Sequence, residues 1–301
     1  MIRRGKYKDR TAVIVESDRL RATLLPDDGA KMASLIDLAT GKEFLATKES
    51  EAYGVLAYDG SYIHSECSAF DDMFPTIDPY TPTHGVYKGV TYPDHGESCR
   101  LPFEVRVEKD KAILSTHSRL FPLRMTKTVS PAADGGISLR YDITNEGNTP
   151  FDFIWAGHII LKGEDGSRLL TPFDEDTPTE MIFATEGYAH DTLPKDRLTG
   201  YRQGEGAAYK FYYTEPLREG YFALSYTDGR ILSFRFDREK LPYLGVWLNN
   251  GEFQDLYSIA PEPCTAPFDA PDKASAKGYV SKISANTSFS FEIHIQIGEN
   301  I

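Results

Sequence analysis

The fold class is decided by Phe289-Ser290-Phe291-Glu292-Ile293-His294-Ile295-Gln296-Ile297, a stretch near the end of the 301-residue chain. Apolar and polar residues alternate strictly along it. This is the pattern of an antiparallel strand that buries one face and exposes the other. Residues 137–144 repeat the pattern, so the two stretches predict a sheet with one buried face.

Further strands are predicted along most of the chain. Asp228-Gly229 separates two apolar runs and predicts a hairpin, because this dipeptide suits a tight turn between strands. There is no long amphipathic helical pattern, no linker and no repeat with a period of about 20 to 50 residues, which disfavours a propeller or solenoid. We therefore predict an all-β protein, a large antiparallel β-sandwich with residues 1–301 in a single domain. Its expected strands are 11–16, 20–25, 31–38, 43–45, 103–108, 112–118, 123–129, 137–143, 151–161, 221–226, 231–236, 243–248, 256–260 and 289–297.

Two long stretches lack a clear period. Residues 58–97 are rich in Tyr, Pro, Gly, Asp and His, and residues 171–208 are acidic and predicted to be loop. Long irregular stretches inside a compact domain are usually functional or disordered. The aromatic residues in 58–97 argue against disorder there.

The charge of the chain excludes several kinds of partner. Its formal net charge is −12, which repels both the phosphates of nucleic acid and an anionic membrane surface. The longest apolar stretch, residues 151–161, is interrupted by polar residues and too short to span a bilayer. We therefore expect neither nucleic acid nor membrane as a partner.

The cysteines and the N-terminus predict a cytoplasmic location. The chain has three cysteines, Cys67, Cys99 and Cys264, and no C-x-x-C pair. An odd number of cysteines does not indicate a disulfide framework and fits a reducing compartment. No apolar run follows the basic residues at the N-terminus, so a secretory signal is not indicated.

One carboxylate is held in the proline-rich stretch Tyr257-Ser258-Ile259-Ala260-Pro261-Glu262-Pro263-Cys264-Thr265-Ala266-Pro267. Proline fixes φ and biases the residue before it toward extended backbone. We therefore expect Glu262 in a stiff, extended segment at the end of a strand, where it could meet a substrate at a fixed angle. The alternative is a solvated glutamate in a loop.

Two histidines are further candidates. His95 lies in Asp94-His95-Gly96-Glu97, where it could exchange a proton near neutral pH or simply follow a turn. His158 lies inside the apolar run 151–161, beside Gly157. A glycine in a strand indicates a bulge or a close approach of backbone. A hydrogen-bonded histidine of the core is the other interpretation.

A second group of candidates combines carboxylates with aromatic rings. Ala69-Phe70-Asp71-Asp72-Met73-Phe74-Pro75-Thr76 has the composition of a sugar site, and equally that of a tight turn or helix cap. Trp247 could stack on the face of a sugar or fill the core.

No metal site is predicted. The conceivable ligands lack the H-x-H and H-E-x-x-H spacings; they are His84, Asp94, His95 and Glu97. The sequence also lacks a nucleophile elbow, a P-loop and a dinucleotide-binding motif. The other histidines show no pairing: His64, His84, His117, His190 and His294.

In their order along nearly the whole chain, these pieces resemble the aldose 1-epimerase family, the galactose mutarotase-like β-sandwiches. The resemblance is carried by Gly29-Ala30-Lys31-Met32-Ala33-Ser34-Leu35, Thr40-Gly41-Lys42-Glu43-Phe44-Leu45, Phe74-Pro75, Asp94-His95-Gly96-Glu97, Phe121-Pro122-Leu123, His158, Glu262-Pro263-Cys264-Thr265 and Phe289-Ser290-Phe291-Glu292-Ile293.

The resemblance implies roles for three residues. Glu262 would be the general base that takes the proton of the anomeric hydroxyl, and His158 the general acid that protonates the ring oxygen. His95 would hydrogen-bond near that oxygen. Such a pair needs different environments, so that one group is ionised while the other is protonated. The implied partner is a small-molecule sugar, no cofactor is needed, and a monomer or homodimer is expected.

The chain also departs from the family pattern. The asparagine–arginine segment that binds sugar hydroxyls is missing before the first histidine, and Phe70-Asp71-Asp72-Met73-Phe74-Pro75 occupies its region. The family's substrate-binding aspartate has no counterpart. We expect Asp72 and Trp247 to line the pocket instead, and no particular sugar is predicted.

Three other functions stay open. A phosphorylated-sugar epimerase would need an arginine cluster, for which Arg100, Arg119 and Arg124 are available. A carbohydrate-binding protein would keep the sandwich without the chemistry. A glycosidase or lyase would combine Glu262 with Asp71 or Asp72.

Overall fold

The computed structural model describes residues 1–185, 201, 203–204 and 206–298. Nearly all of its regular structure is antiparallel β-sheet, which confirms the predicted fold class. Two large sheets share one hydrophobic core, and a small two-stranded sheet stands apart from them.

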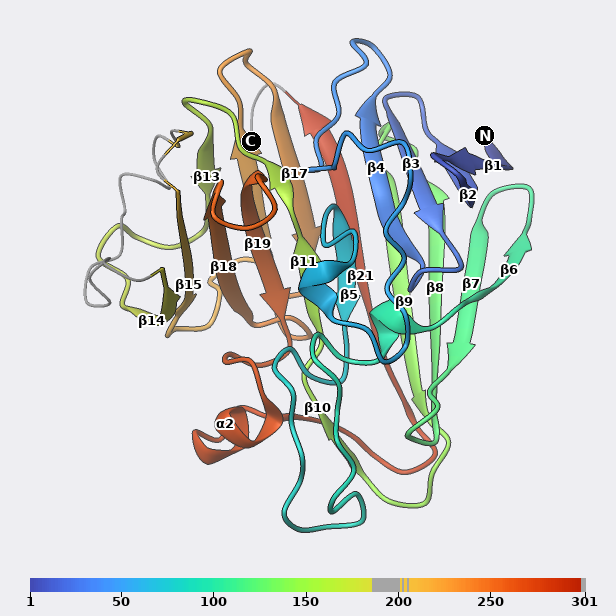
Figure 1. Ribbon diagram of the computed structural model, residues 1–301, viewed down its shortest axis with the longest axis vertical. Coiled ribbons are helices and arrows are strands. Elements are labelled where there is room, and N and C mark those ends of the chain that lie inside the picture. Colours follow the sequence, from blue (N-terminus) through green and yellow to red (C-terminus); the bar gives the residue numbers. More distant parts are fainter. Residues whose placement is uncertain (186–200, 202, 205, 299–301) are drawn as a thin grey trace.

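The larger sheet contains the centre of the molecule. In Figure 1, β5 and β11 lie near its middle, with β1 at one side and β14 at the other. The order is β1 (Ile2–Tyr7), β2 (Arg10–Glu16), β3 (Leu20–Leu25), β4 (Lys31–Asp37), β5 (Phe70–Met73), β11 (Ala156–Ile159), β19 (Tyr257–Cys264), β18 (Tyr243–Asn250), β15 (Ala207–Tyr213) and β14 (Thr179–Ala184), and β12 (Leu161–Lys162) also pairs with β19.

The smaller sheet runs in the order β13 (Arg168–Leu170), β16 (Tyr221–Ser225), β17 (Ile231–Phe236), β21 (Ser288–Gly298), β9 (Ile137–Asn145), β8 (Leu123–Pro131), β7 (Ala112–His117) and β6 (Glu104–Val107). The two-stranded sheet pairs β10 (Phe151–Phe153) with β20 (Ser281–Ile283). Within the described residues the helical segments are α2 (Pro271–Ala276) and the 3-10 turns η1 (Tyr62–His64) and η2 (Ser98–Arg100). No helix among the described residues is long and apolar enough to cross a membrane.

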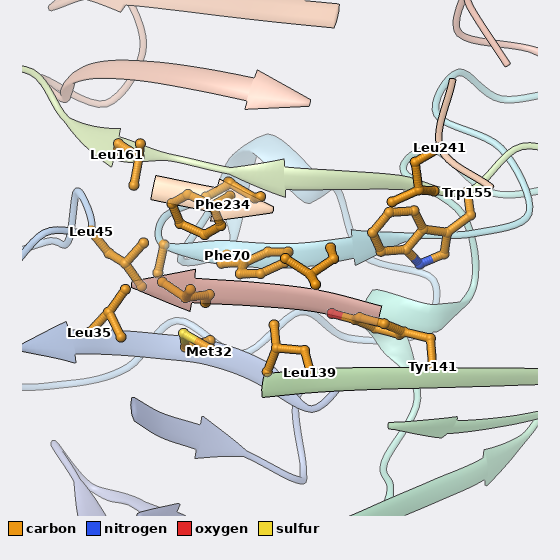
Figure 2. Packing of buried hydrophobic residues seen from close by; sticks show 14 of the residues in the cluster. Met32, Leu35, Leu45, Phe70, Leu139, Tyr141, Trp155, Leu161, Phe234 and Leu241 are labelled. Carbon is orange, nitrogen blue, oxygen red and sulfur yellow. The ribbon is translucent and has the colours of Figure 1, made fainter. Parts of the chain in front are cut away.

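The core lies between the two large sheets. Figure 2 shows Met32 and Phe70 of the larger sheet in the same cluster as Leu139 and Phe234 of the smaller one. In β21 the alternating isoleucines are buried and the polar residues between them are not, as the sequence pattern predicted. Burial of this apolar surface stabilises the sandwich.

Residues 58–97, in which we predicted no strand, contain β5, which occupies the middle of the larger sheet. All four of its residues are buried, including two aspartates that point to opposite faces. Each aspartate pairs with a buried lysine, Asp71 with Lys31 and Asp72 with Lys127. Because both faces carry a charge that is paired only in the folded state, no apolar alternation marks this strand. In residues 171–208 the edge strand β14 was likewise missed.

Glu262 does not lie at the end of a strand, because β19 continues through both prolines to Cys264. Gly245 of β18 is the cross-strand partner of Glu262. On its other side β19 pairs with β11 at Cys264 and with β12 at residues 258–259. In the described chain residues 260–263 have no strand partner on that side. Proline lacks an N–H for a ladder, and this interruption accommodates Pro261 and Pro263.

Two other strand predictions change in detail. Residues 151–161 form three short strands, because the chain leaves the small sheet and joins the larger one within this run. The hairpin predicted for residues 31–45 is reduced beyond β4 to isolated bridges such as Ile36↔Glu43. The hairpin at Asp228-Gly229 is confirmed as β16 and β17.

The pair between Lys127 and Asp72 generates a stability prediction. Their charged atoms are 2.9 Å apart and both side chains are buried. Asp72→Asn leaves the ammonium unpaired beside the rings of Phe70 and Tyr141, so the free energy of unfolding in urea should fall by about 3–5 kcal/mol. The double variant Asp72→Leu/Lys127→Met should recover most of the loss, because no charge is left buried. A loss below about 1 kcal/mol for Asp72→Asn would contradict this account.

Candidate active site

Three polar side chains, those of Asp71, His158 and Glu262, project from one face of the larger sheet. Asp71 is the cross-strand partner of His158. Ala156, two residues before His158, pairs with Cys264, two residues after Glu262. Side chains two residues apart on a strand share a face, as do direct cross-strand partners. This face is turned away from the core, since the alternate residues of these strands lie between the sheets.

A cavity of about 260 Å³ opens over this face. Glu262, His158 and His95 all line it, so the fold brings together the three residues whose roles the family resemblance implied. They come from β19, from β11 and from the segment before η2, which are far apart in the sequence.

Glu262 is almost completely buried, with 1% of its surface exposed. Its Oε2 accepts a hydrogen bond from Nζ of Lys210 on β15. Its Oε1 has no hydrogen-bond partner in the described part of the chain and lies 3.8 Å from Nε2 of His158. One carboxylate oxygen is therefore held, and the other is free to accept a proton from a ligand.

The charges of this pair depend on each other. Burial raises the pKa of the Glu262 carboxyl, and the positive charge of Lys210 opposes that rise. Burial alone would lower the pKa of the Lys210 ammonium, but the negative charges of Glu262 and Asp269 more than offset this and raise it. Lys210 is thus held as a cation beside the candidate base. Asp269 is 4.0 Å from it and accepts a hydrogen bond of 2.6 Å from the hydroxyl of Tyr212.

His158 is buried, and its other nitrogen, Nδ1, lies 3.0 Å from the hydroxyl of Tyr62. Burial lowers the pKa of His158 well below its usual value, and the nearby His95, Lys210 and Lys31 lower it further. The imidazole is therefore neutral at neutral pH. Gly157 beside it leaves room for the rings of Trp155 and Phe70, which an added Cβ would meet at 3.2 and 3.3 Å.

His95 is positioned by a tight turn. Its φ is +59°, in the left-handed region, and the following Gly96 has a φ of +75°. A Cβ on Gly96 would lie 2.3 Å from the carbonyl oxygen of Phe74, so only glycine allows this close approach. The ring of His95 then stacks on Tyr62 with centroids 3.7 Å apart, while Asp94 contacts its Nδ1 at 2.9 Å.

Trp247 also lines the cavity. It forms a cluster with Phe183 and Phe253, whose ring centroids are 5.6 and 5.4 Å from its own. Such flat faces suit stacking on the apolar face of a ring.

Asp72, which we expected to line the pocket with Trp247, projects from the opposite face of β5 into the sandwich. It pairs with Lys127 there and is not among the residues that line the cavity. The expectation was wrong because two consecutive residues of a strand point to opposite faces, and the sequence did not show that this segment is a strand.

The remaining candidates lie elsewhere. Glu97 accepts hydrogen bonds from the hydroxyls of Tyr58 and Ser118 and does not line the cavity. The described residues contain no group of three or more metal-ligating side chains arranged to hold an ion. His64, His84, His117 and His294 are outside the cavity lining, and His190 lies outside the described residues.

Sequence reasoning missed Lys210, Tyr62 and Asp269. For Lys210 a signal existed, because a lysine stands in the otherwise apolar and aromatic run of β15, and a buried lysine requires a partner. Nothing comparable marks Tyr62 or Asp269 among the many tyrosines and aspartates of the chain.

No family model and no curated protein matches the sequence. Solved structures do match. A galactose mutarotase-like protein from Lactobacillus casei has a TM-score of 0.68 at 16% identity, with 95% of this chain and 100% of that chain covered. One from Clostridium acetobutylicum has a TM-score of 0.68 at 12% identity, covering 99% and 98%. The aldose epimerase homologue from C. elegans has a TM-score of 0.62 at 14% identity, covering 95% and 99%.

The chain therefore has the galactose mutarotase-like fold. This confirms, at the level of the fold, the resemblance that the ordered sequence motifs indicated. At such low identities the likeness carries no specific activity, and the function has to be argued from the site itself.

The Lys210–Glu262 contact generates a prediction about titration. Lys210→Met removes the cation that opposes the rise in the pKa of Glu262, so this pKa should move further upward. The carboxyl carbon of Glu262, identified by its loss in Glu262→Gln, can be followed by ¹³C NMR during a pH titration.

Lys42→Met is the matched control, because Lys42 also contacts two carboxylates, Glu164 at 2.9 Å and Asp228 at 2.8 Å, but does not line the cavity. It should leave the Glu262 titration unchanged. An unchanged midpoint in Lys210→Met would show that Lys210 does not set the charge of Glu262.

Proposed function

We propose that this protein is an aldose 1-epimerase, which interconverts the α and β anomers of an aldose by acid–base catalysis. The observation that carries the proposal is the free Oε1 of Glu262, buried at the cavity and 3.8 Å from Nε2 of His158. A carboxylate oxygen and an imidazole nitrogen so close together can serve the two oxygens bonded to one anomeric carbon.

In the proposed reaction the ionised carboxylate of Glu262 takes the proton from the anomeric hydroxyl, while His158 in its imidazolium form, with a proton on both ring nitrogens, gives the proton on Nε2 to the ring oxygen. The bond between C1 and the ring oxygen breaks, its electrons go to that oxygen, and C1 becomes an aldehyde. After rotation about C1–C2 the ring closes on the other face, and both protons return. The reaction is balanced without an oxidant or a group carrier.

The electrostatics support an exchange of the acid and base roles between Glu262 and His158. Burial disfavours the charged form of both groups, since it raises the pKa of Glu262 and lowers that of His158. At 3.8 Å the ionised carboxylate and the protonated imidazole attract each other, which offsets part of that cost. Ring opening and ring closure need the same pair in opposite roles.

The charges around the cavity support an uncharged sugar rather than a phosphorylated one. The ammonium of Lys210 is already paired with Glu262 and close to Asp269. None of the three candidate arginines lines the cavity. Arg100 donates to backbone carbonyls, Arg119 stacks on Tyr58 and Arg124 contacts Glu146. A phosphate would thus meet no free cation among the described lining residues.

The geometry gives less support to the other candidates. A glycosidase or lyase would need Asp71 or Asp72 opposite Glu262, but both pair with buried lysines and neither lines the cavity. A protein that only binds sugar would gain nothing from leaving a buried carboxylate oxygen unpaired next to a histidine, since that costs free energy.

The proposal predicts an activity. Proton NMR of freshly dissolved α-glucose and α-galactose should show faster exchange between the anomers with the protein than without it. Glu262→Gln should lower this rate by about 10²- to 10⁴-fold, because it removes the base. Glu146→Gln, the same change at an exposed carboxylate, should have no effect.

A broader panel then tests the substrate class. Uncharged aldoses should be accepted in preference to their phosphates. Release of reducing ends from a glycoside would indicate hydrolysis instead, and a shift of the melting temperature with sugar but no exchange would indicate binding alone. Either result would contradict the proposal.

A further inference from the structure

Tyr62 occupies a central position that the proposed chemistry does not use directly. Its ring stacks on His95 with an interplanar angle of 7°. Its hydroxyl lies 3.0 Å from Nδ1 of His158 and 2.8 Å from Oδ2 of Asp71. The side chain therefore contacts both histidines of the candidate site and a buried carboxylate behind them.

Asp71 is the next member of this chain of contacts. Its Oδ2 is 3.0 Å from Nζ of Lys31, and the two side chains are only 2% and 3% exposed. Lys31 belongs to β4 and Asp71 to β5, so the pair crosses neighbouring strands on the cavity side of the sheet. Burial raises the pKa of the Asp71 carboxyl, and the adjacent Lys31 ammonium, whose own pKa Asp71 raises, opposes that rise and favours the ionised carboxylate. An ionised carboxylate can only accept hydrogen bonds.

These contacts determine where the protons lie. The hydroxyl of Tyr62 has one proton for two neighbours, Asp71 and His158. If it donated to His158, two oxygens without a proton between them would face each other at 2.8 Å. The hydroxyl must therefore donate to Asp71, and Nδ1 of His158 must carry the hydrogen that bonds to the oxygen of Tyr62.

We propose that Lys31, Asp71 and Tyr62 are positioning residues that fix neutral His158 with its hydrogen on Nδ1. Nε2 then carries the lone pair and faces Oε1 of Glu262 at 3.8 Å. It is the nitrogen that accepts and returns a proton at the substrate, a role that rests on the proposed function.

The arrangement has a consequence for the reaction. With the hydrogen on Nε2, neutral His158 could not accept a proton from a substrate oxygen, and its lone pair would face Tyr62. A hydrogen bond on Nδ1 also fixes the plane of the ring, as the orienting partners of active-site histidines do. Lys31, Asp71 and Tyr62 thus hold His158 so that one defined nitrogen, Nε2, faces the cavity.

The tautomer of His158 can be measured without any substrate. Two-bond ¹H–¹⁵N correlation spectra distinguish Nδ1–H, Nε2–H and cationic imidazoles, and the signals of His158 are those lost in His158→Gln. We expect Nδ1–H at neutral pH in the unmodified protein. Nε2–H or a cationic ring would overturn the proposal, and this test does not depend on any variant that alters Tyr62.

Tyr62→Phe removes the hydroxyl but keeps the ring that stacks on His95. We expect His158 to lose the pure Nδ1–H tautomer in this variant. Tyr141→Phe is the matched control, because Tyr141 is equally buried but faces the sandwich core; it should leave His158 unchanged. Retention of the pure Nδ1–H tautomer in a folded Tyr62→Phe protein would also overturn the proposal.

Anomer exchange supplies the second readout. Tyr62→Phe should lower kcat by about 10- to 100-fold, the range typical for outer hydrogen-bond partners that orient metal-bound histidines. A protein that shows the expected tautomers but exchanges no anomers would support the positioning role and overturn the proposed function. The positioning role and the proposed function can therefore be disproved independently of each other.

Discussion

The contact between Lys210 and Glu262 is the interaction on which the site depends. It joins β15 to β19 across β18, where Gly245 lies between Glu262 of β19 and Tyr212 of β15. A side chain there would collide with the ring of Tyr212, at 2.8 Å from an added Cβ. The pair holds one oxygen of a buried carboxylate and leaves the other unpaired, which places chemical reactivity at a single defined atom.

Buried pairs of a lysine and a carboxylate recur at the middle of the larger sheet. Asp71 pairs with Lys31 on the cavity face, and Asp72 pairs with Lys127 on the core face. Burying a lone charge costs several kcal/mol, and the attraction of a close partner offsets that cost. Lys31 comes from β4 beside β5, Lys127 from β8 of the other large sheet, and Lys210 from β15, which β18 separates from β19. The paired charges thus tie the strands together and leave Oε1 of Glu262 and Nε2 of His158 facing each other.

The fold is shared with galactose mutarotase-like proteins at 12% and 16% identity, so its architecture tolerates replacement of most side chains. A sandwich needs only apolar residues of suitable volume on its inner faces. The site is less tolerant, because a carboxylate, an imidazole and an ammonium must meet within a few ångströms. Lys210 and Tyr62 are therefore more informative about the function of this chain than the surrounding sheets are.

The sequence alone determined the all-β class and most of the strands, because alternation such as that of β21 is a local property that a half-buried face imposes. It also singled out Glu262, His158, His95 and Trp247, which all line one cavity. Only the tertiary structure decided that β5 is a central strand, that Asp72 faces the core, and that Lys210 and Tyr62 join the site. These features depend on ion pairs and hydrogen bonds between residues far apart in the chain, and the register of the strands alone brings such residues together.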